Sequence, residues 1–175
     1  MKNQLPHASK PHLVQAQIPS GSATLLCLSH LRWNFVFQRP QHLMSRFAQT
    51  HRVLFWEEPE YDASLTEPEV REQVDAKTGV IRLTPILQRP ARWEREQLRD
   101  LLDAYLAEHP AEGPLVRWYY TPMMLPISEH LQADCTVYDC MDELANFKAA
   151  PPQLLPLEQR LLDQADLVFT GGYSL

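Results

Sequence analysis

The sequence predicts a doubly wound α/β fold, a single Rossmann-like domain built on a parallel sheet of about six strands. Short runs of residues are apolar nearly throughout, as parallel strands covered on both faces must be. Amphipathic segments separate these runs in regular alternation, which is typical of a parallel sheet with helices on both faces. The chain has 175 residues, enough for one domain of ordinary size.

The first two strands and the helix between them form a βαβ unit. Residues 25–29 predict the first strand and residues 53–56 the second. Pro40 suits the first turn of the connecting helix, because its fixed φ is compatible with that position. The apolar side of this helix would carry Leu43, Met44, Phe47 and Ala48.

The middle of the chain predicts two more strands and the clearest helix. Residues 60–77 are acidic and lack a clear period, so we expect a surface excursion there. Residues 80–86 predict the third strand, with Pro85 near its end. Leucines and a tyrosine recur at helical spacing over 92–109, and residues 115–120 predict the fourth strand.

The last part of the chain predicts two further strands. Residues 123–131 form a short helix or turn, and residues 135–138 the fifth strand. A helix over 154–165 then leads to the sixth strand at 166–170. Because residues 171–174 resemble the start of a further turn and helix, we expect that more polypeptide follows residue 175.

The N-terminal segment lacks the features of a targeting signal. Residues 1–24 contain no continuous apolar stretch, so we interpret them as a flexible leader and residues 25–175 as the folded domain. No stretch is apolar over the length needed to span a bilayer. We therefore expect a cytoplasmic protein.

The charge balance narrows the range of partners. The 16 basic and 22 acidic residues give a net charge of −6, which argues against nucleic acid. It also disfavours strong binding to an anionic membrane, but leaves open a peripheral association of a local patch with the inner membrane. The three cysteines, Cys27, Cys135 and Cys140, lie in apolar runs and do not have the spacing of a zinc site. We expect them to be small buried hydrophobic residues, and we expect no metal site.

The loop after the first strand, residues 29–42, is the first candidate site. It holds two arginines, two histidines and three aromatic residues, but no G-x-G-x-x-G pattern, which disfavours NAD or FAD as a cofactor. Arg39 and the backbone N–H groups at the start of the helix suit an anion such as a diphosphate. The alternative is that the aromatics pin the loop to the sheet and the arginines are solvated. The candidate ligand-binding residues are Ser29, His30, Arg32, Arg39, Gln41 and His42.

Carboxylates follow two other strands. Asp139, Asp142 and Glu143 come after the fifth strand, and a site that binds sugar hydroxyls gains from such acceptors. Glu57 and Glu58 after the second strand have the same potential. Tyr120, at the end of the fourth strand, has two interpretations. Its ring could stack against a sugar ring, or it could pack in the core. A solvated acidic turn and a salt-bridged surface are the alternatives for the carboxylates.

Several strings resemble bacterial glycosyltransferases with the GT-B fold, most closely the teichuronic-acid type of the retaining family four. The resemblance runs from about residue 25 to residue 175. The strings are S-H-L-R-W at 29–33, Q-R-P-Q-H-L at 38–43, E-E-P at 57–59, Y-D-C-M-D-E at 138–143 and A-D-L-V-F-T at 165–170. The second and fourth of these are the specific ones.

The resemblance implies two Rossmann-like domains that face each other across a cleft. In that family the N-terminal domain holds the acceptor and the C-terminal domain binds the nucleotide-sugar donor, so this chain would be the acceptor-side half, inactive alone. It would serve the synthesis of cell-envelope or exopolysaccharide glycans, with no cofactor and no protein nucleophile. His30, Tyr120 and Asp139 would be the catalytic residues.

The resemblance is not complete. Many family members have glycines where this chain has His30, Leu31 and Arg32, and histidines where it has Tyr120 and Asp139. Two other readings remain open: half of a GT-B sugar-nucleotide epimerase, and a non-catalytic Rossmann-like interaction module.

Overall fold

The fold is built on one eight-stranded, mostly parallel sheet, seen in a computed structural model that describes residues 22–90, 94–146 and 150–171. Most of the expected leader therefore lies outside the described residues. Six strands run in parallel in the order β5-β2-β1-β6-β7-β8. They are β1 (Thr24–Leu28), β2 (Arg52–Trp56), β5 (Ile81–Leu87), β6 (Leu115–Tyr119), β7 (Cys135–Cys140) and β8 (Leu167–Thr170). These are the six predicted strands, in the order typical of a Rossmann fold.

The expected surface excursion over 60–77 contains two strands, so that expectation was wrong in part. β3 (Glu60–Tyr61) runs parallel to β5, and β4 (Glu69–Val74) pairs antiparallel with the same strand. β4 lies at the edge of the sheet, and most of its side chains are exposed. Because it buries so little, its sequence carries almost no apolar alternation. Pro85 lies beyond the part of β5 that pairs with β2.

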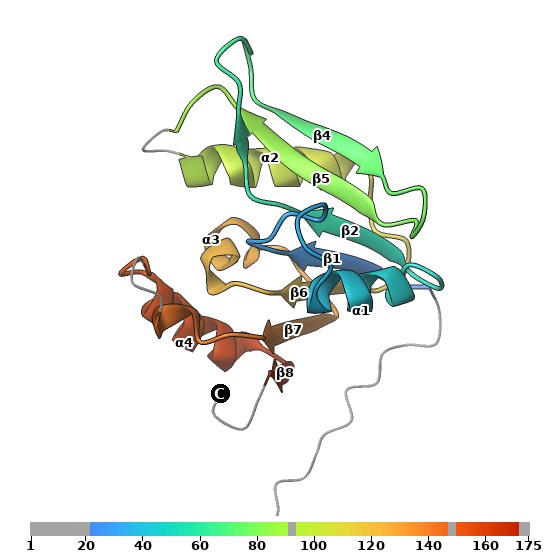
Figure 1. The fold of residues 1–175 in the computed structure, drawn as a ribbon, viewed down its shortest axis with the longest axis vertical. Helices are drawn as coiled ribbons and strands as arrows, with labels where there is room; N and C mark the ends of the chain where they lie inside the picture. Colours follow the sequence, from blue (N-terminus) through green and yellow to red (C-terminus); the bar gives the residue numbers. More distant parts are fainter. Residues whose placement is uncertain (1–21, 91–93, 147–149, 172–175) are drawn as a thin grey trace, which may run out of the picture.

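The helices cover both faces of the sheet, as predicted. Figure 1 shows α1 on one side of the sheet and α2, α3 and α4 on the other. The helices are α1 (Arg39–Phe47), α2 (Glu94–Glu108), α3 (Leu125–Ser128) and α4 (Leu154–Gln164), with single 3-10 turns at η1 (Pro122–Met124) and η2 (Leu144–Asn146). The first residues of the helix predicted over 92–109 lie outside the described residues.

Two apolar cores result, one on each face of the sheet. Successive side chains of a strand point to opposite faces, so Leu26 and Leu28 of β1 pack under α2 to α4, while Leu25 and Cys27 pack on the α1 side. Cys27 and Cys135 are buried and Cys140 is half-buried, all as free thiols. The cysteines therefore pack largely as predicted.

Trp33 takes a place that a helix often fills in this fold. Residues 57–80 connect β2 to β5 and are all described, but they contain no helix to cover the α1 face. Instead, Trp33 packs edge-on against Phe55, with the ring centroids 5.0 Å apart. Its indole N–H donates a hydrogen bond to Asp75 Oδ2 at 2.9 Å, which is the main reason that the pKa of Asp75 is lowered. Trp33 thereby ties the loop after β1 to the turn between β4 and β5.

Gly113 and Gly79 allow a paired test of backbone packing. Both have positive φ, +74° and +77°, but a Cβ at Gly113 would lie 2.4 Å from the carbonyl oxygen of Ser22, whereas Gly79 faces open space. We expect Gly79→Ala to lower the free energy of unfolding by about 1 kcal/mol, the cost of a side chain in this conformation. Gly113→Ala should cost about 1–3 kcal/mol more, because backbone must shift. Equal losses in urea denaturation would contradict this account.

Candidate functional site

The carboxyl ends of three neighbouring strands meet where the strand order reverses. In the parallel register Leu28 of β1 lies beside Tyr119 of β6, which in turn lies beside Tyr138 of β7. The residues that follow, Ser29, Tyr120 and Asp139, are therefore neighbours, and the Tyr120 N–H donates to the Leu28 carbonyl at 2.9 Å. In open α/β sheets this switch point is where ligands bind. We call it the crevice.

An ion pair joins α1 to β7 at the crevice. Arg39 is the first residue of α1; its Nη2 lies 2.8 Å from Asp139 Oδ1, and its Nε donates to Asp139 Oδ2 at 3.1 Å. The Asp139 side chain is 0% exposed, whereas that of Arg39 is 37% exposed. β7 is two residues longer than the predicted strand, so Asp139 lies within it and not in the loop beyond.

Polar atoms without hydrogen bonds surround the carboxylate of Asp139. Within the described part of the chain, the buried Trp118 Nε1 and Tyr120 Oη make no hydrogen bond, and Asp139 Oδ1 contacts the Arg39 guanidinium through the ion pair. Burial raises the pKa of Asp139 above its usual value, and the Arg39 guanidinium opposes that rise. Burial also raises the pKa of Tyr120, with smaller contributions from Cys27 and Asp139. Tyr120 is therefore a neutral phenol at physiological pH.

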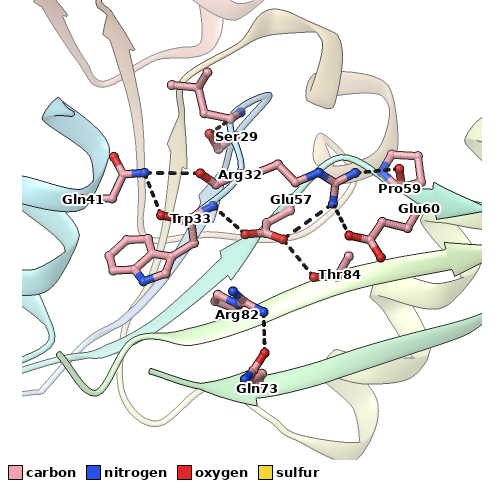
Figure 2. A network of polar contacts seen from close by, with 11 residues as sticks. Ser29, Arg32, Trp33, Gln41, Glu57, Pro59, Glu60, Gln73, Arg82 and Thr84 are labelled. Atoms are coloured by element: carbon pink, nitrogen blue, oxygen red, sulfur yellow. Dashed lines mark hydrogen bonds and ion pairs between the residues drawn. The ribbon is translucent and has the colours of Figure 1, made fainter. Parts of the chain in front are cut away.

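A second buried carboxylate, Glu57, holds the loop between β1 and α1. Figure 2 shows Glu57 between this loop and β5. Its carboxylate accepts hydrogen bonds from the backbone N–H of Trp33 at 2.6 Å and from Thr84 Oγ1 at 2.9 Å. Arg32 Nη1 lies 3.7 Å from it, and also donates to Glu60 Oε1 at 3.2 Å. Glu57 thus holds the backbone of the loop against β5.

Two more predicted residues stabilise the same loop. Gln41 Nε2 donates to the Trp33 carbonyl at 3.1 Å and to the Arg32 carbonyl at 3.3 Å, and its Oε1 accepts from the N–H of Gln38. Gln41 is buried, as is Ser29, whose Oγ accepts from the Leu31 N–H at 2.9 Å. These contacts organise the entry into α1 (Figure 2).

Glu58 lines a hollow of about 330 Å³ beside the crevice. The hollow lies between the end of β2 and η1, which follows β6. Its walls combine apolar side chains with carboxylates, a phenol and a cation: Pro59, Tyr61, Glu94, Arg95, Leu98, Met123, Met124 and Ile127. Partial burial raises the pKa of Glu58, against the effect of Arg32. The Tyr61 hydroxyl donates to Glu94 Oε2 at 2.9 Å.

His30 lies at the end of β1, beside Tyr120 and Asp142. Its Nδ1 is buried and has no hydrogen-bond partner among the described residues. Burial lowers the pKa of His30, while the Asp142 carboxylate and a backbone contact with Tyr120 act in the opposite direction. His30 is therefore a neutral imidazole at pH 7, able to accept or to donate one proton.

The remaining predicted residues lie away from the crevice. His42 is exposed on α1, where its ring packs edge-on against Phe37 at 4.5 Å. Glu143 lines a separate hollow of about 260 Å³ beside α4, together with Tyr138 and Glu158. The structure thus brings together Ser29, His30, Arg39, Tyr120, Asp139 and Asp142, while Arg32, Gln41 and Glu57 support the loop.

Sequence reasoning missed Trp118, Tyr61 and Glu94. Trp118 lies inside a predicted strand, where an aromatic residue reads as core, and nothing local to it signals an unpartnered N–H. Tyr61 and Glu94 lie 33 positions apart and meet only because α2 packs beside the end of β3. No motif could have linked them.

No family model matches the chain, and no curated protein matches it. A solved structure with a similar chain is described as "Trehalose-6-phosphate from E. coli bound with UDP-2-fluoro glucose". The two chains share 12% identity at a TM-score of 0.48, over 83% of this chain and 39% of that one. This chain therefore spans about two fifths of that structure. So distant a likeness carries no argument about function, and the strand order itself defines the fold here.

The described residues contain neither a helix that could span a membrane nor a cluster of metal ligands. No helix among them is long and apolar enough to cross a membrane. No group of three or more His, Cys, Asp or Glu side chains in residues 22–90, 94–146 and 150–171 is arranged to hold a metal ion.

Glu57 should contribute strongly to stability. We expect Glu57→Ala to lower the free energy of unfolding by about 2–3 kcal/mol, because the buried Trp33 N–H and Thr84 hydroxyl lose their acceptor. Glu60→Gln is the matched control, since it removes an exposed partner of the same arginine and should cost less than about 0.5 kcal/mol. Urea denaturation of the two variants would refute this role for Glu57 if their losses were the same.

The burial of His30 predicts a pH dependence. In an NMR titration its ring should protonate with a midpoint below the ordinary value of about 6.5. Because the folded-state pKa is the lower one, the stability linked to neutral His30 is present above the unfolded pKa and is lost as pH falls toward the folded pKa. His30→Gln should remove this part of the acid sensitivity. A midpoint above the ordinary value would mean that Asp142 outweighs burial.

Proposed function

We propose that residues 25–175 form the N-terminal, acceptor-side half of a two-domain GT-B glycosyltransferase, which moves a sugar from a nucleotide-sugar donor to a hydroxyl acceptor. The observation that carries this proposal is the meeting of Ser29, Arg39, Tyr120 and Asp139 at the switch point of the sheet. The two most specific strings of the resemblance, 38–43 and 138–143, contact each other there through Arg39 and Asp139.

Arg39 is the group suited to the leaving diphosphate. Its guanidinium is partly exposed at the N-terminus of α1, where the helix dipole also favours negative charge. Glycosyl transfer passes through an oxocarbenium-like transition state in which negative charge develops on the departing phosphate. A fixed cation at that point lowers the barrier without a protein nucleophile.

The hollow beside Glu58 suits the acceptor. Met123, Met124 and Ile127 give it apolar walls against which the C–H face of a sugar ring can pack, and Glu58 and Glu94 offer acceptors for hydroxyl groups. It lies at the same carboxyl edge of the sheet as the crevice but on the face covered by α2 and α3, whereas Trp118 and Tyr120 pack on the α1 face. Holding an acceptor there would orient its hydroxyl toward a donor bound at the crevice.

In a GT-B enzyme a second domain binds the donor, so on this proposal residues 25–175 orient an acceptor and need such a domain to complete the reaction. On this proposal the enzyme works in the cytoplasm, in the synthesis of cell-envelope or exopolysaccharide glycans, and a peripheral association with the inner membrane stays open. Its partners are a nucleotide sugar and a glycan or other hydroxyl acceptor, without nucleic acid. The resemblance of the strings supports the pathway and the ligands, and the net charge of −6 supports a partner other than nucleic acid.

Product analysis tests the proposal. The full-length polypeptide, incubated with a panel of nucleotide-diphosphate sugars and hydroxyl acceptors, should release nucleoside diphosphate and attach the sugar to an acceptor. Arg39→Ala should lower kcat by about 10²-fold, and Glu60→Gln should leave it unchanged. Acceptor-independent isomerisation of the nucleotide sugar would indicate an epimerase instead. The absence of any turnover and of any nucleotide-sugar binding would indicate an interaction module.

A further inference from the structure

We propose that Asp139 is a positioning residue: it fixes the guanidinium of Arg39 at the mouth of the crevice as an anchor for a diphosphate and does not itself touch the substrate. The resemblance implies a catalytic role for Asp139, so positioning is a different role for the same carboxylate. The inference rests on the proposed function for the identity of the anion.

The geometry of the pair fixes the orientation of the arginine. Asp139 engages Nε and Nη2, one edge of the planar guanidinium, through both of its oxygens. Nη1 lies at the opposite edge of the group and makes no hydrogen bond to any described residue, so none of these residues occupies its two N–H donors. A guanidinium held along one edge can offer its free N–H donors to phosphate oxygens with little further loss of freedom.

Asp139 cannot reach a ligand in this arrangement. Its side chain is 0% exposed, and the partners that face it are Arg39, Trp118 and Tyr120. Trp118 and Tyr120 are themselves buried, at 7% and 2% exposure, and they cover the side of the carboxylate that faces the core. Arg39 alone carries the charge of the pair to the surface.

The free N–H groups of Arg39 distinguish it from the structural arginines. Arg32 is exposed to a similar degree, 36%, beside the buried Glu57, but its Nη1 and Nη2 donate to Glu60 and to the Pro59 carbonyl. Arg117, on the neighbouring strand β6, is buried, and it donates to the Ser128 carbonyl at 3.0 Å and to Thr136 Oγ1 at 2.8 Å. Arg160 and Glu129 form an ion pair in which both side chains are substantially exposed. Arg39 combines a fully buried partner with a half-open guanidinium. A buried ion pair adds little net stability to a protein. The pair between Arg39 and Asp139 is therefore better explained by the positioning of the guanidinium than by a contribution to stability.

The 175-residue protein itself can test the inference with inorganic pyrophosphate as the probe. In NMR titrations, pyrophosphate should shift the side-chain resonances of Arg39, and Asp139→Asn should weaken its binding about tenfold. If Asp139 acts only through Arg39, Asp139→Asn should have no such effect in the Arg39→Ala background. Glu60→Gln, which frees the exposed side of Arg32, is the matched control and should leave the affinity within about twofold.

One measurement needs no variant. In the wild-type protein the Arg39 Nε–H resonance should be protected from solvent exchange, because that group donates to Asp139. Rapid exchange there, no pyrophosphate-dependent shift at Arg39, or an equal effect of Asp139→Asn with and without Arg39 would each overturn the inference. These results are independent of sugar transfer, so a failed product analysis with a positive titration would refute the proposed function and leave the positioning role intact.

Discussion

The common direction and register of six strands is the constraint on which the rest of the structure depends. Because β1, β6 and β7 run in parallel with their ends aligned, Ser29 and Asp139, which are 110 positions apart in the chain, lie at one edge of the sheet. An antiparallel arrangement would send alternate ends to opposite edges. The ion pair between Arg39 and Asp139, the exposed hollow beside Glu58 and the position of His30 all follow from this alignment.

Charge is distributed unevenly along the chain, and the fold compensates for it. No acidic residue precedes Glu57, so the segment that forms β1, the following loop and α1 contains arginines without local partners. Two of these arginines find carboxylates from later strands: Arg32 approaches Glu57, and Arg39 is held by Asp139. Both carboxylates are almost fully buried. The cationic loop is thus fastened at two points by charges that lie beneath it.

Much of the fold could be predicted from the sequence, because fully buried parallel strands leave continuous apolar runs. Five of the six parallel strands are largely buried, and β8 is mostly exposed at the other edge of the sheet but still carries an apolar run, so all six and the helices between them were found in this way. The edge strand β4 was missed because it buries little more than Val70. The candidate site was predictable only as a set of strand ends. Glu57 and Glu58 are adjacent and chemically alike, yet one is buried and the other exposed. That difference depends on Thr84 and on the Trp33 backbone, which approach from distant parts of the chain.

The ion pair at the end of β7 also has a consequence for protein engineering. Replacing a buried ion pair with apolar side chains of similar volume is often neutral or stabilising, so a redesign that scored stability alone would favour removing Asp139 and Arg39 together. The variant would then gain heat resistance but lose the fixed positive charge that Arg39 presents at the surface. Efforts to make this domain more robust should therefore hold these two positions constant and look for improvement at the exposed edge strand instead.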